Sequence, residues 1–227
     1  MNQSTRRLGW IAALAGVISW GAACSSIPHG IKTSPPSAKA SISAEDLFLQ
    51  GVEQFRAGQF SRAKDTFDRV ISAQPRHLQA LNYRGRSLVQ IKQWGPASRD
   101  FDACLEIDSR FVPAFSGKAM IDMANKDYAS ALSRLDQALS IDTLDSEIHF
   151  LKGMVLGYQN QLDLSIQAFK KCLEIDPDHA YAHYHLGLAY NQAGRKDLAI
   201  VHLEKFLALA PAAPEADQVR SLLASLR

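Results

Sequence analysis

Residues 153–187 of the chain read GMVLGYQNQLDLSIQAFKKCLEIDPDHAYAHYHLG, and the glycines at the two ends of this stretch lie 34 residues apart. The same interval recurs along most of the chain, as expected when one helix-turn-helix unit is repeated in tandem. Four columns of residues keep this register without an insertion. They are Gly51, Gly85, Ala119, Gly153 and Gly187; Ala63, Ala97, Ala131, Ser165 and Ala199; Phe67, Phe101, Leu135, Phe169 and Leu203; and Pro75, Ser109, Thr143, Pro177 and Pro211.

Each column has a physical reason. Small residues in the first helix and early in the second let two antiparallel helices approach closely, and the large apolar residue fills the space beside them. Proline ends the second helix because it lacks an amide donor and clashes with the preceding turn. The first repeat is therefore predicted to form helices near 45–57 and 61–73. The turn between the two helices needs a residue with positive φ, and the residues at that place are Gly58, Lys92, Lys126, Asn160 and Gly194.

These columns resemble the pattern of tetratricopeptide repeats. Five contiguous repeats cover about three quarters of the chain, at 44–77, 78–111, 112–145, 146–179 and 180–213. The resemblance implies an all-α fold, a right-handed α-solenoid of five tandem helix-turn-helix units. Repeat three departs most from the pattern, because Ala119, Asp122 and Thr143 stand where the family has glycine, a large apolar residue and proline.

A further helix is predicted in residues 214–227. Val219, Leu222, Leu223 and Leu226 fall on one helical face, with polar residues elsewhere. We expect this segment to cap the last repeat, because an open-ended solenoid would otherwise expose apolar surface to water.

The start of the chain has the features of an export signal. Arg6 and Arg7 precede an apolar stretch from Leu8 to Ala23 that is short for a membrane span. Cys24 follows this stretch directly and resembles the acylated cysteine of bacterial lipoproteins, although Gly21 stands where that family usually has leucine. Ordinary secretory cleavage after Ala23 is the alternative.

If the lipoprotein resemblance holds, Ser25 after the cysteine implies the outer membrane, with the protein facing the periplasm. The alternative is a soluble periplasmic protein. Residues 24–43 are rich in Ser and Pro and are predicted to form a disordered tether.

The charge balance argues against a nucleic-acid partner. Of the 25 basic residues, Arg6 and Arg7 lie in the predicted signal, which leaves 23 basic and 23 acidic residues. A neutral surface lacks the basic footprint that phosphate binding requires.

Cys104 and Cys172 occupy the same column two repeats apart, too distant for a disulfide, so both are predicted to be small core residues. His179, His183 and His185 cluster at the junction of repeats four and five, with His149 and His202 near them. A zinc or copper site is conceivable there, but no cysteine or carboxylate stands at a convincing spacing. We therefore expect no metal, no cofactor and packed histidines.

No catalytic motif is present in the sequence. It has no phosphate-binding Gly-x-x-x-x-Gly-Lys loop, no His-Glu-x-x-His and no Gly-x-Ser-x-Gly. The prediction is a protein that is not an enzyme.

The resemblance also assigns a binding surface, because in the family positions 2, 5, 9, 12 and 13 of each repeat line a concave groove. In this chain those positions are unusually apolar and aromatic. The predicted contact residues are Phe48, Phe55, Met120, Met123, Phe150, Met154, Tyr158, Tyr181, Tyr184 and Asn191. Packing of these side chains against neighbouring helices is the competing interpretation.

The favoured function is a membrane-tethered periplasmic scaffold that captures an apolar or amphipathic helix, or an extended peptide, of a partner protein. The resemblance implies processes such as pilus or envelope assembly. Self-association through the groove is the first alternative, and a histidine-based metal-binding role is the second.

Overall fold

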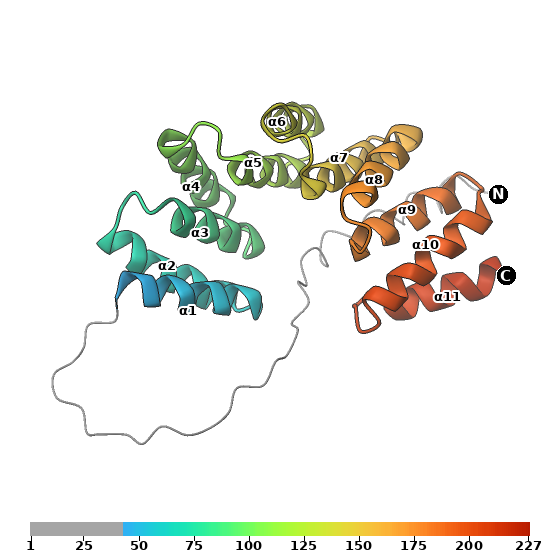
Figure 1. Cartoon of the computed structure of the whole chain (residues 1–227), viewed down its shortest axis with the longest axis horizontal. Helices are drawn as coiled ribbons and strands as arrows, with labels where there is room; N and C mark the ends of the chain where they lie inside the picture. Colours follow the sequence, from blue (N-terminus) through green and yellow to red (C-terminus); the bar gives the residue numbers. More distant parts are fainter. Residues whose placement is uncertain (1–42) are drawn as a thin grey trace, which may run out of the picture. The chain divides into compact units, whose positions relative to one another are not determined.

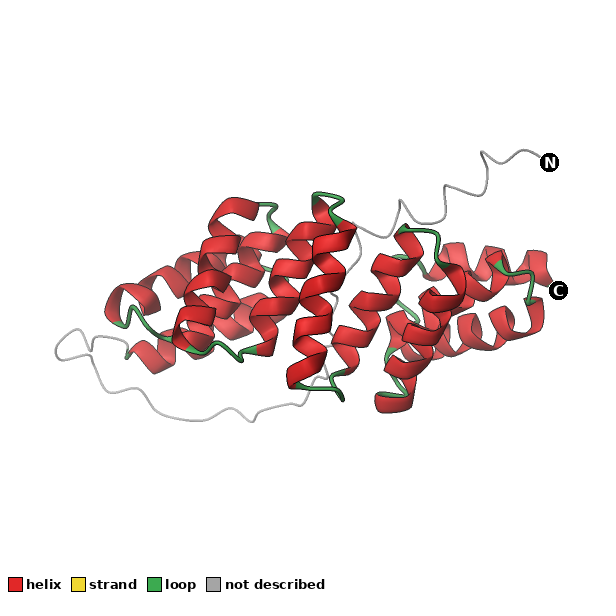
Figure 2. Cartoon of the chain, turned by 90° about the horizontal axis from the view of Figure 1, so that it is seen from above, coloured by secondary structure: helices red, strands yellow, loops and turns green. Residues whose placement is uncertain are grey.

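The computed structural model describes residues 43–227, which form eleven α-helices and no β-strand (Figures 1 and 2). The helices are α1 (Ala44–Arg56), α2 (Phe60–Ala73), α3 (Leu78–Gln90), α4 (Trp94–Ile107), α5 (Val112–Ala124), α6 (Tyr128–Ile141), α7 (Ser146–Tyr158), α8 (Leu162–Ile175), α9 (Ala180–Gln192), α10 (Lys196–Leu209) and α11 (Ala216–Leu226). The all-α prediction is confirmed for this part of the chain. The predicted signal peptide, Cys24 and nearly all of the predicted tether lie outside the described residues.

Each repeat contributes two helices. We call the first of each pair (α1, α3, α5, α7, α9) the A helix and the second (α2, α4, α6, α8, α10) the B helix. In repeat one the bounds lie within one residue of those predicted. The residue in the turn between A and B has positive φ in every repeat, with values of 71° at Gly58, 59° at Lys92, 63° at Lys126, 61° at Asn160 and 75° at Gly194.

Capping hydrogen bonds and the proline column mark where the helices begin and end. Asp145 accepts a hydrogen bond from the Ile148 amide and caps α7, and Asp127 caps α6 in the same way. The B helices end two residues before the proline column, and this holds in repeat three as well, where Thr143 replaces proline. The repeat geometry therefore survives the loss of that proline.

The seam between A and B is as close as the small-residue column predicts. A β-carbon built on Gly153 would lie 2.6 Å from the Phe169 ring, and one built on Gly187 would lie 2.7 Å from Leu203 Cγ. Phe169 and Leu203 are fully buried. Glycine at this position thus lets the helices approach within a distance that a methyl group would block.

The described residues divide into two compact units. The amino-terminal unit holds α1–α4 and ends at Ser109, and the carboxyl-terminal unit holds α5–α11 and begins at Arg110. Within each unit, every B helix contacts the A helix of its own repeat, and α2, α6, α8 and α10 also contact the helix that follows them.

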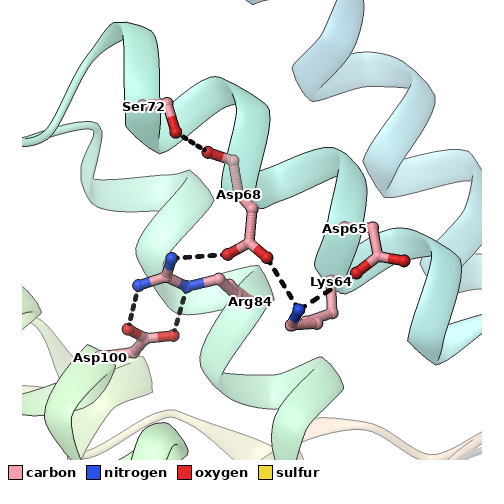
Figure 3. Close-up of polar contacts among 6 residues, drawn as sticks. All are labelled: Lys64, Asp65, Asp68, Ser72, Arg84 and Asp100. Atoms are coloured by element: carbon pink, nitrogen blue, oxygen red, sulfur yellow. Dashed lines mark hydrogen bonds and ion pairs between the residues drawn. The ribbon is translucent and has the colours of Figure 1, made fainter.

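The amino-terminal unit combines an aromatic core with an ionic network. Arg84 on α3 donates two hydrogen bonds to Asp100 on α4, at 2.8 and 2.5 Å, and one to Asp68 on α2 at 2.8 Å (Figure 3). Lys64 approaches the other Asp68 oxygen at 2.9 Å. Asp100 is only 4% exposed, and burial raises the pKa of its carboxyl despite the neighbouring guanidinium. The Arg84 guanidinium therefore joins three helices, and one of the two carboxylates that it contacts is buried.

The carboxyl-terminal unit ends with α11, which follows α10 after a short turn. Val219 and Leu223 are buried with Phe206 and Tyr184, and Leu222 and Leu226 pack half-buried against that cluster. All four apolar residues predicted for the capping face thus contact the last repeat.

The described residues 43–227 contain no helix that is both long and apolar enough to cross a membrane. Cys104 and Cys172 are buried free thiols, as predicted. Burial raises the pKa of each thiol to about 12, so neither is a reactive thiolate at neutral pH.

Candidate partner-binding face

The A helices of the carboxyl-terminal unit present one face away from their B helices. Gly153 and Gly187, at position 8 of their repeats, point at the B helix. With about 100° per residue, positions 2, 9 and 13 lie roughly 100–140° around the axis from position 8. We call this surface the A face. Its residues, on α5, α7, α9 and α11 and at the residue that precedes α11, are Pro113, Met120, Ala124, Glu147, Met154, Tyr158, Tyr181, Leu188, Gln192, Glu215, Leu222 and Leu226.

Burial separates the ten predicted contact residues into two groups. Five are buried: Phe55, Met123, Phe150, Met154 and Tyr184. Five remain half-buried: Phe48, Met120, Tyr158, Tyr181 and Asn191. In this conformation a ligand can reach the second group only. Contact of any of them with a partner stays a prediction.

Helix rotation explains most of the burial. Positions 5 and 12 lie only about 40–60° from position 8, so their side chains turn toward the B helix. Phe150, at position 5, has its ring centroid 5.9 Å from that of Phe169, and Tyr184 lies 5.1 Å from Phe206. Phe55 and Met123 are at position 12. Met154, at position 9, is also buried and lies in the hydrophobic cluster of its unit, whereas Phe48 at position 5 and Asn191 at position 12 stay half-buried.

Two tyrosines contribute to the A face, and the hydroxyl oxygen of Tyr158 is itself buried. Tyr158 stacks on Tyr128 at 5.7 Å, and burial raises the pKa of Tyr158 to about 12. Tyr181 donates a hydrogen bond to Glu215 at 3.2 Å, and burial, with Glu215 beside it, raises the pKa of Tyr181 to about 12. Both phenols are therefore neutral hydrogen-bond donors across the physiological range.

Phe48 lies in the amino-terminal unit, where it packs against aromatic rings. Its ring centroid is 4.9 Å from that of His77 and 5.9 Å from that of Tyr83. Arg86 lies over the buried Phe55 ring at 5.1 Å. The predicted residues of repeat one are thus largely occupied by packing inside their own unit.

The histidines of repeat five are packed between helices. His183 Nε2 lies 3.0 Å from the Pro177 carbonyl, which can only accept, so Nε2 carries the hydrogen. His183 Nδ1 then accepts from His202 Nδ1 at 2.9 Å. Burial lowers the pKa of both rings, that of His202 to about 4. Within residues 43–227 no three His, Cys, Asp or Glu side chains gather as a metal site would require.

Comparison with known proteins identifies the repeats. One family model, described as "TPR repeat", matches residues 153–194, and two described as "Tetratricopeptide repeat" match residues 48–96 and 180–212. This chain is a tetratricopeptide repeat protein. No curated protein sequence matches it.

Solved structures share the fold of this tetratricopeptide repeat protein. TTC0263, a thermophilic TPR protein of Thermus thermophilus, is 19% identical with a TM-score of 0.70, and the match covers 81% of this chain and 98% of that one. PilW, described as a widely conserved type IV pilus biogenesis factor, is 17% identical with a TM-score of 0.68, covering 81% and 85%. Pseudomonas aeruginosa PilF is 17% identical with a TM-score of 0.63, covering 81% and 88%.

The A face also includes residues that the predicted contact set lacked. Leu188, at position 9 of repeat five, is half-buried. Leu222 lies in α11, and Glu215 is the residue before this helix. The segment was expected only as a cap. The signal was present in the 34-residue period, because Glu215 and Leu222 follow Tyr181 and Leu188 by that interval. The capping helix of this tetratricopeptide repeat protein thus stands in the register of a sixth A helix.

Proposed function

We propose that this protein is an interaction scaffold that captures an apolar or amphipathic helix of a partner protein on the A face of its carboxyl-terminal unit. Scaffolding of protein partners is the general role of tetratricopeptide repeats. The binding surface on this chain and the helical nature of its ligand are what we propose. No catalytic step is part of it.

One observation carries the proposal. Met120, Leu188 and Leu222 are half-buried in one row at position 9 on α5, α9 and α11, beside Tyr158 and Tyr181. Apolar side chains aligned across several helices and left in contact with water are typical of an interaction surface. Methionine and aromatic side chains adapt readily to an apolar partner.

The proposal includes a membrane tether. Acylation of Cys24 would hold the repeats at the periplasmic face of the outer membrane through the segment 25–43, and the support for this step is the sequence alone. We place the function in pilus or envelope assembly as a working proposal. The pilus biogenesis factor among the similar structures suggests that direction, and at 17% identity the likeness itself extends to the fold only.

Site-specific photo-crosslinking tests the proposed surface. A photoreactive phenylalanine analogue placed at Leu188 or Tyr158 in the native host should yield a covalent adduct with a partner protein. The matched control is Val201 on α10, which is 58% exposed and lies outside the A face. Adducts at Val201 but not at Leu188 or Tyr158 would contradict the proposal, and adducts between two copies of the chain would favour self-association.

A further inference from the structure

The A face carries a one-sided charge. Positions 2, 9 and 13 of the four A-type repeats in the carboxyl-terminal unit hold two glutamates, Glu147 and Glu215, and no lysine or arginine. Both glutamates stand at position 2, near the amino-terminal ends of α7 and α11. The negative charge therefore lies along one edge of the apolar row.

Neighbouring donors hold both carboxylates in place. His179 Nδ1 accepts from the Ala182 amide at 3.1 Å, so its Nε2 hydrogen points at Glu147 Oε2, 3.5 Å away. Glu215 accepts from the neutral Tyr181 hydroxyl. A carboxylate has about four acceptor sites, so each retains capacity for further donors.

The nearest basic residues on the same helices are already paired. Lys152 on α7 contacts Asp136 at 2.6 Å, and Arg220 on α11 contacts Asp217 at 2.6 Å. Among the described residues, neither Glu147 nor Glu215 forms an ion pair with a lysine or arginine. The edge therefore offers negative charge to a partner.

The spacing of the two carboxylates sets the separation expected between two positive charges on a partner helix. Glu147 and Glu215 lie on A-type helices two repeats apart, and helices that pack side by side are about 8–10 Å apart, which gives about 16–20 Å between them. Along an α-helix that rises 1.5 Å per residue, this distance corresponds to about eleven to thirteen residues, and a separation of about eleven, or three turns, keeps both side chains on one face.

We infer that the A face accepts an amphipathic helix whose apolar side is bordered, along one edge, by two lysine or arginine residues about eleven residues apart. The apolar side covers Met120, Leu188 and Leu222, and the two cations meet Glu147 and Glu215. This inference rests on the proposed function and adds the charge pattern of the partner.

Designed peptides test the charge pattern. One labelled helical peptide of about 18 residues carries a leucine and alanine face with two lysines about eleven residues apart. A second peptide has glutamate in place of both lysines, and a third has the two lysines one turn apart. Binding to the purified full chain is measured by fluorescence anisotropy at about 50 mM and about 500 mM salt.

We expect the first peptide to bind about 10-fold more tightly than the second and more tightly than the third, with the difference shrinking at high salt. The double variant Glu147→Gln, Glu215→Gln keeps one acceptor oxygen in each side chain and removes the charge, and it should bind the first peptide about 5- to 30-fold more weakly. The matched control is Glu174→Gln, Glu204→Gln, which removes two exposed charges from α8 and α10 and should leave affinity within about twofold.

Equal affinity for the lysine and glutamate peptides, or equal weakening by the two double variants, would overturn the inference. If Leu188→Asp then abolished binding of both peptides alike, the apolar surface of the proposed function would stand without its charge pattern. Absence of binding by every peptide would also overturn the inference, whereas the crosslinking experiment judges the proposed function separately.

Discussion

Phe169 occupies the space that a side chain at Gly153 would need, with two of its ring atoms 2.6 Å from the position of a β-carbon. We predict that Gly153→Ala destabilises the carboxyl-terminal unit by about 1–3 kcal/mol, because the fully buried ring must shift. Urea unfolding measures the change. Gly95→Ala is the control, since its β-carbon would meet nothing within 4 Å inside helix α4, and it should be neutral or stabilising.

Repeat three has a different pair of residues at these two positions. Ala119 and Leu135 stand at the positions of Gly153 and Phe169, and both are fully buried. The double variant Gly153→Ala, Phe169→Leu should therefore recover part of the stability lost in the single variant. A double variant less stable than Gly153→Ala would show that the smaller side chain does not relieve the contact.

The sequence predicted the fold well because each column of the repeat records one local contact. The glycine and phenylalanine columns predicted the close seam, and the turn residues predicted positive φ even at Lys92 and Lys126. The binding face was harder to predict. Phe150 and Tyr181 are both aromatic residues on A helices, and only their rotation relative to the B helix decides that the first is buried and the second is accessible.

Acid should weaken the fold through the buried histidines. Burial lowers the pKa of His185 to about 3 and that of His202 to about 4, against an ordinary value of 6.5. Between pH 6.5 and the lowered pKa of each histidine, the unfolded chain binds protons that the folded chain does not. The free energy of unfolding therefore has its full histidine contribution above about pH 6.5 and falls as the pH drops toward 4. Each such group contributes at most about 1.4 kcal/mol per pH unit.

Chemical unfolding at a series of pH values checks this expectation. His202→Gln should reduce the slope of stability against pH below 6.5, because one proton-binding difference is removed. Val201→Gln, an exposed and non-titrating neighbour on α10, serves as the control and should keep the slope of the parent protein. A slope unchanged by His202→Gln would contradict the assignment.

The carboxyl-terminal helix should be required for the stability of its unit. Ending the chain after Ala213 removes α11 and uncovers Tyr184 and Phe206, which now lie buried against Val219 and Leu223. Each fully buried aliphatic side chain contributes about 1.5–3 kcal/mol, so the loss is comparable with the whole stability of a small domain. Thermal unfolding and solubility of the truncated protein measure it, and Ser221→Ala, at an exposed position of α11, should leave both unchanged.

Acylation at Cys24 is expected from the sequence, and metabolic labelling with a fatty-acid analogue checks it. The parent protein should be labelled and should fractionate with membranes. Cys24→Ala should lose the label. Equal labelling of the two proteins would contradict acylation at this residue, and secretion of an unlabelled parent protein would favour ordinary signal cleavage.

The Arg84 network should stabilise the amino-terminal unit only while both Arg84 and Asp100 are present. Removing Arg84 by Arg84→Met leaves Asp100, which is 4% exposed, without its bidentate partner. An uncompensated buried charge costs about 3–5 kcal/mol, and the partial exposure of Arg84 places the expected loss at the lower end of that range. The loss should narrow toward acid pH, because without the guanidinium the already raised pKa of Asp100 rises further and protonation neutralises the group.

The double variant Arg84→Met, Asp100→Leu separates the cost of a stranded charge from the value of the pair. An apolar replacement of both partners often recovers most of the loss or more, so this variant should be markedly more stable than Arg84→Met alone. Arg227→Met provides the surface comparison, since Arg227 and Glu204 are both largely exposed, and it should change stability by no more than about 1 kcal/mol. If the double variant were as unstable as Arg84→Met, the ion pair itself, and not the unpaired Asp100, would hold α3 against α4.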